Sequence, residues 1–449
     1  MKKKTIGIYI LFFLILFGCF KLNPFKVYNN ERTMEQIFAN SPEAWSNDSE
    51  SYVIGSLIES MKFGMSSGVG RLSRLHDENA EHWFYNVQIT YKAFEEDNLD
   101  LANDFELYYS QLGGQGVLFR FINKALISFD GTTRLSIMRN INVILISLVL
   151  SIIAVYIMKI TNLSTAIFFL MGLLLNQWLP ISVTNLYWVS WSWFLPMAIA
   201  AIYCLKENPS KKTTILFYAL IFLSVVFKCS SGYEFISTVL VAMIIPFVYK
   251  ELSNFKSIIV SIKNLIIPTI IGIFGFLFTF ILHILRYMLG GWDLKDSIEF
   301  LKIIIIKRTN GSLIPLGIDV EAWEMALSEP YLSLFKRYFN ASSLNIVVGN
   351  NIYEIRFWIV FLLITIFGLF LGYFIKSNKI EDKNKAINYI LITLLSVLAP
   401  FSWYILARGH AAAHLLLDPI LFYVPFIPMG FGLIGYTISK GVKKWNMTK

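Results

Sequence analysis

Apolar residues in this chain fall into long runs that are separated by short polar segments. Ten of these runs approach the roughly 20 residues that a helix needs to cross a bilayer. The pattern therefore predicts an all-α polytopic membrane protein with about ten transmembrane helices. The predicted spans are Thr5–Phe20, Ile141–Met158, Thr165–Val183, Trp191–Leu205, Thr214–Phe227, Phe235–Tyr249, Leu265–Tyr287, Phe357–Ile375, Ala386–Leu406 and Pro419–Ser439.

The basic residues between these spans predict the orientation of the chain. Lysines gather in every second segment, whereas the short segments on the other side hold Lys228 and Arg408 as their basic residues. Cytoplasmic loops are enriched in Lys and Arg, so both termini are predicted to be cytoplasmic, in a multi-pass protein of the plasma membrane. The lysine-rich segments are 1–4, 159–164, 206–213, 250–264, 376–385 and 440–449.

This topology divides the chain into five parts and leaves two long extracytoplasmic loops, which are expected to bear interfacial helices. Tryptophans near the outer span ends are interpreted as an interfacial aromatic belt. They are Trp178, Trp188, Trp191, Trp193 and Trp358. The five parts are the first transmembrane helix (1–20), the first loop (21–140), helices two to seven (141–287), the second loop (288–356), and helices eight to ten with a basic tail (357–449).

Composition agrees with a membrane protein, since 56% of the residues are hydrophobic and only 15% are charged. The net charge of +9 would suggest nucleic acid as a partner in a soluble protein, but basic anchors at the cytoplasmic face explain it here. The N-terminal stretch has the basic start and apolar core of a secretory signal, yet no small-residue cleavage site follows, and we expect an uncleaved helix. The three cysteines show no metal-binding spacing.

The first candidate site follows the first span, in the segment "SNDSESYVIGSLIESMKFG". Asp48 and Glu50 precede apolar residues at helical spacing, and Gly64 is expected to end that helix. The helix is predicted to lie flat on the membrane with its apolar face down. Asp48 and Glu50 are candidate catalytic carboxylates; the alternative is that Asp48 caps the helix and Glu50 stabilises its dipole.

Two further outer segments carry candidate substrate-binding residues. Gln111 and Gln115 flank a glycine turn that allows close approach of a polar ligand, although an ordinary turn before an interfacial helix explains the same pattern. In "FKCSSGYEFI", Lys228 and Glu234 lie at the ends of two helices, beside Tyr233. Charged groups there are expected to face a cavity, with a Lys228–Glu234 salt bridge as the alternative.

The last outer segment, "ARGHAAAHLLLDP", combines Arg408 with His410 and His414. Histidines four residues apart share one face of a helix, but the motif has neither the glutamate nor the third ligand of a zinc site. Guanidinium and imidazole groups can bind phosphate oxygens, so these residues are predicted to bind a phosphate. A solvated loop is the alternative.

Together these features resemble the GT-C superfamily of membrane glycosyltransferases. The resemblance rests on Asp48-Ser49-Glu50 behind the first helix, the helical run that follows, the large loop from Met288 and the segment Arg408–His414. It implies an enzyme that takes a sugar from a polyprenyl-phosphate or polyprenyl-diphosphate donor on the extracytoplasmic face. The acceptor would be a cell-surface glycan or a lipid-linked molecule, and the Lys-, Ile- and Asn-rich composition suggests a bacterium.

The resemblance also implies residue roles. Asp48, and less directly Glu50, would act as general base toward the acceptor hydroxyl. Lys228, Arg408, His410 and His414 would bind the donor phosphate, and Gln111, Gln115, Tyr233 and Glu234 would contact the sugar. A divalent cation, Mg²⁺ or Mn²⁺, held by the two carboxylates is left open, because only some members of the superfamily need a metal.

Two other functions remain open from the sequence. A polymerase or ligase of lipid-linked glycans would use the same outer cations but would not need the carboxylate behind the first helix. A transporter or flippase would be expected to show matching halves, which the sequence lacks.

Overall fold

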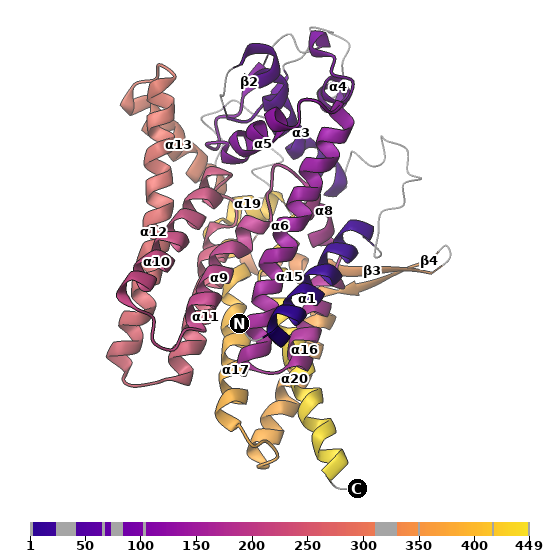
Figure 1. Cartoon of the computed structure of the whole chain (residues 1–449), viewed down its shortest axis with the longest axis vertical. Coiled ribbons are helices and arrows are strands. Elements are labelled where there is room, and N and C mark those ends of the chain that lie inside the picture. The colour runs from indigo at the N-terminus through magenta and orange to yellow at the C-terminus, as the bar shows by residue number, and fades with distance from the viewer. Residues whose placement is uncertain are drawn as a thin grey trace.

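The computed structural model describes residues 3–23, 42–64, 68–72, 84–101, 105–309, 330–348, 351–414 and 417–447. Long helices lie side by side as a bundle, and a smaller group of elements covers one end of it (Figure 1). The helices of the bundle are α1 (Lys3–Leu22), α6 (Gly131–Ile160), α7 (Leu163–Leu174), α8 (Trp178–Thr184), α9 (Trp191–Cys204), α10 (Lys211–Ser230), α11 (Ile236–Ser253), α12 (Ile258–Leu289), α16 (Phe357–Lys376), α17 (Lys383–Ser396), α18 (Leu398–Leu406) and α20 (Phe426–Met447).

Each predicted span coincides with a helix or a pair of helices, although not all are single straight spans. Within the described residues, seven helices are long and apolar enough to cross a membrane, and a bent pair makes an eighth. The polytopic helical architecture is therefore confirmed, while the expected number of ten spans is not. The seven are Lys4–Leu22, Gly131–Ile160, Lys211–Ser230, Ile236–Ser253, Ile258–Leu289, Phe357–Lys376 and Lys383–Leu406.

Three predicted spans differ from a simple crossing helix. The predicted span Thr165–Val183 is the bent pair, in which α7 and α8 meet at 77°. The next predicted span is α9, which has only 14 residues. The last begins as a short 3-10 helix, η3 (Asp418–Tyr423), and continues as α20.

Polar side chains explain where several bundle helices start. Asp130, Asn162, Ser210 and Ser257 each accept a hydrogen bond from the backbone N–H three residues further on, at the start of α6, α7, α10 and α12. Such caps satisfy a backbone donor that the helix itself leaves free. The apolar runs set where the bundle lies, and these caps fix where its helices begin.

Asn176 explains the bend between α7 and α8. Its Oδ1 accepts hydrogen bonds from the backbone N–H groups of Trp178 and Leu179, at 2.9 and 2.7 Å. These contacts start a new helix in a new direction and satisfy the amides that the break sets free. As a result Trp178 lies at the start of α8, inside the protein.

The end of the bundle is covered by α3 (Pro42–Phe63), α4 (Phe84–Glu95) and α5 (Gly114–Ala125). A short 3-10 helix, η1 (Leu99–Leu101), and an antiparallel pair of strands, β1 (Gly70–Leu72) and β2 (Phe105–Leu107), belong to the same group. In β1–β2, Gly70 pairs with Leu107 and Leu72 with Phe105. These elements surround their own small hydrophobic core.

Helix α3 does not lie on a membrane surface as the sequence pattern predicted. Val53, Ile54, Leu57 and Ile58 are all buried in the core of the end cap, and Ser56 on another face is buried as well. A helix that is covered on several faces lies inside a protein. Its end is as predicted, because α3 stops at Phe63 and Gly64 follows with a positive φ of 65°.

The second predicted loop contains two described helices and a hairpin. α13 (Leu294–Thr309) folds back along α12, and α15 (Tyr331–Asn340) packs near α16. Strands β3 (Ser342–Val348) and β4 (Asn351–Arg356) pair antiparallel, from Ser342 with Arg356 to Val348 with Asn351, and project from the side of the bundle (Figure 1). The two small sheets are an addition to the all-α expectation.

Candidate functional site

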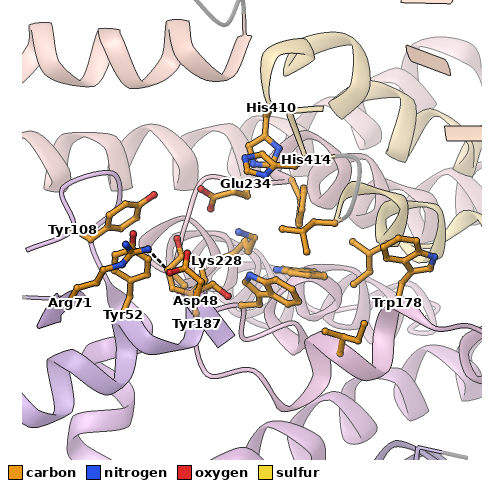
Figure 2. Close-up of a pocket in the computed structure, with 18 residues that line it drawn as sticks. Asp48, Tyr52, Arg71, Tyr108, Trp178, Tyr187, Lys228, Glu234, His410 and His414 are labelled. Carbon is orange, nitrogen blue, oxygen red and sulfur yellow. Dashed lines mark hydrogen bonds and ion pairs between the residues drawn. The ribbon is translucent and has the colours of Figure 1, made fainter. Parts of the chain in front are cut away.

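A cavity of about 300 Å³ lies where the end cap meets the bundle. Its walls come from five regions of the chain: α3, β1–β2, the α8–α9 segment, the α10–α11 turn, and the segment from α19 (Arg408–Ala413) to η3 (Figure 2). The lining residues are Asp48, Ser49, Tyr52, Arg71, Tyr108, Trp178, Ile181, Tyr187, Trp188, Trp193, Lys228, Ser231, Glu234, Phe235, His410, His414, Leu417 and Ile420.

Asp48 lies in the wall of this cavity, paired with Arg71 from β1. The Arg71 guanidinium donates to Oδ1 of Asp48 at 2.5 Å, and Figure 2 shows the two side chains meeting at one end of the cavity. Burial raises the pKa of the Asp48 carboxyl, and Arg71 opposes that rise. Asp48 is six residues inside α3, which begins at Pro42, so the alternative that it caps the helix is wrong.

Close packing of β1 against α3 brings Arg71 to Asp48. A Cβ on Gly55 would lie 2.3 Å from the carbonyl oxygen of Gly70. Any larger residue at position 55 would push the strand away, because a Cβ cannot approach backbone so closely. The glycine therefore fixes the distance between the two elements that carry the ion pair.

Tyrosines cover the same end of the cavity. The ring of Tyr52 lies under the Arg71 guanidinium, 4.2 Å from its central carbon, and 4.6 Å from the ring of Tyr108. The ring of Tyr187 also contacts Tyr52 in a tilted arrangement, with the ring centroids 6.0 Å apart. These aromatic faces hold the guanidinium in place and offer surfaces on which the apolar face of a ring can stack.

Glu50, the second predicted catalytic carboxylate, faces away from the cavity. It accepts hydrogen bonds from the Tyr91 hydroxyl at 2.6 Å, from the Leu186 backbone N–H at 3.1 Å, and from Arg139. Residues two apart in a helix point to different sides, so Asp48 and Glu50 do not act as a pair. Glu50 joins α3 to α6 and to the α8–α9 segment.

Lys228 and Glu234 both line the cavity, as expected, and they do not form the salt bridge that was the alternative. Lys228 donates from Nζ to the carbonyl oxygen of Gly232 at 2.6 Å. Glu234 is instead paired with Arg308 at the end of α13, also at 2.6 Å. Burial disfavours the Glu234 anion, but Arg308, Lys228 and His410 outweigh that effect and hold its pKa at about 2.

The turn between α10 and α11 aims Glu234 into the cavity. Gly232 has a positive φ of 141°, and a Cβ there would lie 2.2 Å from Oε2 of Glu234. Phe235 adopts a φ of 66°, which costs a non-glycine residue roughly 1–2 kcal/mol. The surrounding structure maintains this conformation, and Glu234 and Phe235 both face the cavity as a result.

His410 and His414 share one face of α19 and its end, as their spacing predicted. Their ring centroids are 4.2 Å apart, and both line the cavity above Glu234 in Figure 2. Burial and the neighbouring His410 lower the pKa of His414 well below its usual range, so His414 is neutral near pH 7. Arg408 is not in the cavity wall; its guanidinium lies 4.6 Å from the ring of Tyr331.

Much of the remaining cavity wall is aromatic and apolar. It includes Trp178, Trp188 and Trp193 together with Ile181 and Ile420, and Figure 2 shows Trp178 at the other end of the cavity from Arg71. These three tryptophans were predicted to form an interfacial belt, but Trp178 and Trp193 are buried and face the cavity. The indole N–H of Trp178 donates to the Ser342 carbonyl oxygen at 2.9 Å, which ties this end of the cavity to β3.

Three predicted sugar-binding residues lie outside the cavity wall. Gln111 and Gln115 are fully buried, and their side-chain amides have no hydrogen-bond partner in the described part of the chain. Tyr233 donates its hydroxyl toward the Thr279 carbonyl oxygen and contacts Nδ1 of His283 at 3.2 Å. Of the four predicted sugar contacts, only Glu234 lines the cavity.

The donor set of the cavity does not suit a divalent cation. Asp48 is neutralised by Arg71 and Glu234 by Arg308, and Glu50 points elsewhere. Within the described ranges no three His, Cys, Asp or Glu side chains come together as metal ligands. A hard cation needs several free oxygen ligands, which these paired carboxylates do not offer.

Three residues of the site were not identified from the sequence. Arg71 and Arg308 carry no motif, and only the folded chain shows which carboxylates they neutralise. Asp418 follows His414 within the last candidate segment, and its Oδ2 lies within hydrogen-bond distance of Nδ1 of His410, at 3.1 Å. An acidic residue among apolar neighbours is a signal that could have identified it.

Comparisons with known proteins give likenesses of fold. No protein-family model and no curated protein matches the sequence. The chain is similar to solved structures of an oligosaccharyltransferase from Archaeoglobus fulgidus. One is a complex with Zn and sulfate, at 11% identity and a TM-score of 0.46, covering 98% of this chain and 50% of that one. Another, AglB with an inhibitory peptide and a dolichol-phosphate, has 10% identity and a TM-score of 0.46. That match covers 100% of this chain and 51% of the other.

This chain thus spans about half the length of the solved structures that it matches. The function proposed below is drawn from the residues of the cavity.

Proposed function

We propose that this chain is an integral membrane glycosyltransferase of the GT-C type, which moves a sugar from a polyprenyl-(di)phosphate donor to a cell-surface glycan or lipid-linked acceptor. The observation that carries the proposal is one cavity that joins a buried carboxylate, Asp48, to Lys228, His410 and His414. Such a site offers a base for a hydroxyl and donors for a phosphate. The lysine pattern of the sequence predicts that this cavity faces the extracytoplasmic side.

Asp48 is assigned as the general base. Its pKa is raised by burial, so its carboxylate is a better proton acceptor than an exposed aspartate. Glu234, the other cavity carboxylate, has its pKa held at about 2 by its cations and is therefore a poor base. Glu234 is better suited to accept hydrogen bonds from sugar hydroxyls.

Lys228, His410 and His414 are assigned to the donor phosphate. A departing phosphate gains negative charge as the glycosidic bond breaks, and fixed donors that face that charge lower the barrier. Lys228 carries the positive charge, while His414 is neutral and contributes one ring N–H or lone pair. Arg408 is left out of this role because it is not in the cavity wall.

The transfer proceeds with a balanced exchange of bonds. The acceptor oxygen attacks the anomeric carbon, and its proton passes to the Asp48 carboxylate. The bond from that carbon to the phosphate oxygen breaks, and its electron pair leaves with the phosphate. A single base of this kind suffices for an inverting transfer, in which the acceptor attacks opposite to the bond that breaks.

The aromatic part of the cavity wall fits the apolar parts of the substrates. Trp178, Trp188 and Trp193 offer ring faces for the apolar side of a sugar or for the first isoprene unit of the donor. A cavity of about 300 Å³ has room for one small ring and a phosphate at the reacting centre.

Transfer in proteoliposomes tests the proposal directly. The full chain is reconstituted with a lipid extract from a strain that lacks it, and products are followed by mass spectrometry. A glycosylated product together with free polyprenyl phosphate is expected. Products that grow by whole glycan units would instead show a polymerase, and movement of lipid-linked sugar across the bilayer without new covalent product would show a flippase.

A further inference from the structure

Asp418 is a fully buried carboxylate that the mechanism above does not use. It lies at the start of η3, with no exposed surface. Its Oδ2 accepts a hydrogen bond from the indole N–H of Trp403 at 3.1 Å, and the same oxygen contacts Nδ1 of His410 at 3.1 Å. Among the described residues, His410 is the basic side chain that forms an ion pair with it.

The donor and acceptor roles in this cluster follow from the indole and from the ionised carboxylate. A tryptophan N–H can only donate, so Oδ2 of Asp418 acts as an acceptor there. An ionised carboxylate has no hydrogen to donate, so with Asp418 ionised Oδ2 also takes the hydrogen of Nδ1 from His410. The other ring nitrogen of His410, Nε2, is then available to face the cavity, which His410 lines.

Burial of Asp418 is costly for stability alone. Its second oxygen, Oδ1, is enclosed without a hydrogen-bond partner in the described residues. Burial raises the pKa of the Asp418 carboxyl, while His410 and Trp403 oppose the rise. A buried, half-satisfied carboxylate costs free energy, so a role in the neighbouring site explains its presence better than packing does.

We propose that Asp418 is a positioning residue that holds the His410 ring with Nδ1–H toward Asp418, so that Nε2 faces the substrate phosphate. The inference rests on the proposed function for the identity of that phosphate. The ring keeps this orientation whether His410 is neutral or charged, because Nδ1 carries a proton in both cases. When charged, His410 presents Nε2–H as a hydrogen-bond donor to the departing phosphate oxygen.

The backbone around Asp418 fixes the same geometry. Its N–H donates to the carbonyl oxygen of His414 at 3.0 Å, and its own carbonyl oxygen accepts from the Tyr404 hydroxyl at 3.0 Å. The His410 ring also packs edge-on against Trp403 and Phe235. Rotation of the imidazole is thus restricted by rings on its sides and by a carboxylate behind it.

Nitrogen NMR of the histidine side chains tests this inference. The full chain is labelled with ¹⁵N-histidine in nanodiscs, and His410→Gln assigns the His410 signals. The wild type is expected to show Nδ1 of His410 with the shift of a protonated, pyrrole-type nitrogen. A pyridine-type Nδ1 in the neutral wild-type ring would overturn the inference, and this measurement requires no variant of Asp418.

Two variants extend the test. Asp418→Asn is expected to mix the two His410 tautomers and to lower kcat of transfer about 100-fold, a loss typical of one lost transition-state donor, with little change in KM. Trp403→Phe removes only the second hydrogen bond of Asp418 and is expected to keep the wild-type tautomer. An unchanged His410 tautomer in a folded Asp418→Asn protein would overturn the inference and leave the proposed function standing.

The NMR readout does not depend on catalysis. If the expected tautomer is found but no transfer is detected in proteoliposomes, the proposed function fails while the Asp418–His410 arrangement stands. The two conclusions are therefore separated by experiment.

Discussion

The Arg71 guanidinium lies 2.5 Å from Oδ1 of Asp48, and both side chains line the cavity. The pair joins β1 to α3 and places a cation beside the carboxylate that we assign as the base. Arg71 lowers the pKa of Asp48, in opposition to the effect of burial. The carboxylate is therefore kept available for proton transfer, even though it is buried.

Arg71→Gln is predicted to shift the pH dependence of transfer. Loss of the guanidinium leaves burial unopposed, so the pKa of Asp48 rises further. A base works only when ionised, so activity is lost as the pH falls through this pKa, and the acid limb moves to higher pH. The measurement is kcat/KM against pH in proteoliposomes. An acid limb that stays in place or moves to lower pH would contradict the assignment of Asp48.

Glu50→Gln is predicted to weaken the fold more than the chemistry. The substitution leaves Arg139 without its buried carboxylate, and removal of one partner of a buried ion pair costs about 3 kcal/mol. Thermal unfolding in detergent should show a lower Tm, while the fraction that remains folded retains transfer at a rate near that of the wild type. Loss of transfer at full stability would instead assign a catalytic role to Glu50.

Lys228→Met is predicted to weaken binding of the lipid donor. A hydrogen bond to a charged group contributes about 1.5–3 kcal/mol, so KM for the donor should rise roughly 10- to 100-fold with a smaller change for the acceptor. Lys92→Met removes an exposed lysine of the end cap and is the matched control. A rise confined to the acceptor KM would be evidence against phosphate binding at Lys228.

Trp188→Leu is predicted to raise the KM of the sugar donor about fivefold. The half-buried indole lines the cavity, and an aromatic contact contributes roughly 1 kcal/mol beyond its buried area. Trp358→Leu, at an exposed tryptophan outside the cavity wall, is the control. Equal effects of the two substitutions would show that the loss is not specific to the cavity.

The apolar runs predicted the bundle well, because a bilayer-spanning helix needs length and hydrophobicity and little else. They did not predict the bend at Asn176, since one polar residue inside an apolar run gives no sign of where its side chain will bind. The two short sheets were also missed, and β1 with only three residues is too short to show a strand pattern. The burial of α3 depends on α4 and α5 packing over it, which its own sequence does not reveal.

The candidate site was predicted in part. The position of Asp48 behind the first helix and the spacing of His410 and His414 identified three residues that do meet in one cavity. Arg408, Gln111 and Gln115 were chosen by residue type and lie outside its wall. Arg71 and Arg308 come from elements far from their carboxylates in the sequence, so their pairing is set by tertiary structure alone.

A strain that lacks this chain is expected to accumulate the lipid-linked sugar. Complementing that strain with the wild-type chain or a variant, and measuring its lipid carriers, tests the central claim most directly. Wild-type chain and Asp100→Asn, an exposed end-cap control, should both clear the accumulated lipid-linked sugar. Asp48→Asn, present in the membrane at the wild-type level, should leave it uncleared, because loss of a general base slows transfer about 10²- to 10⁴-fold. Clearance by Asp48→Asn at the wild-type rate would contradict the account.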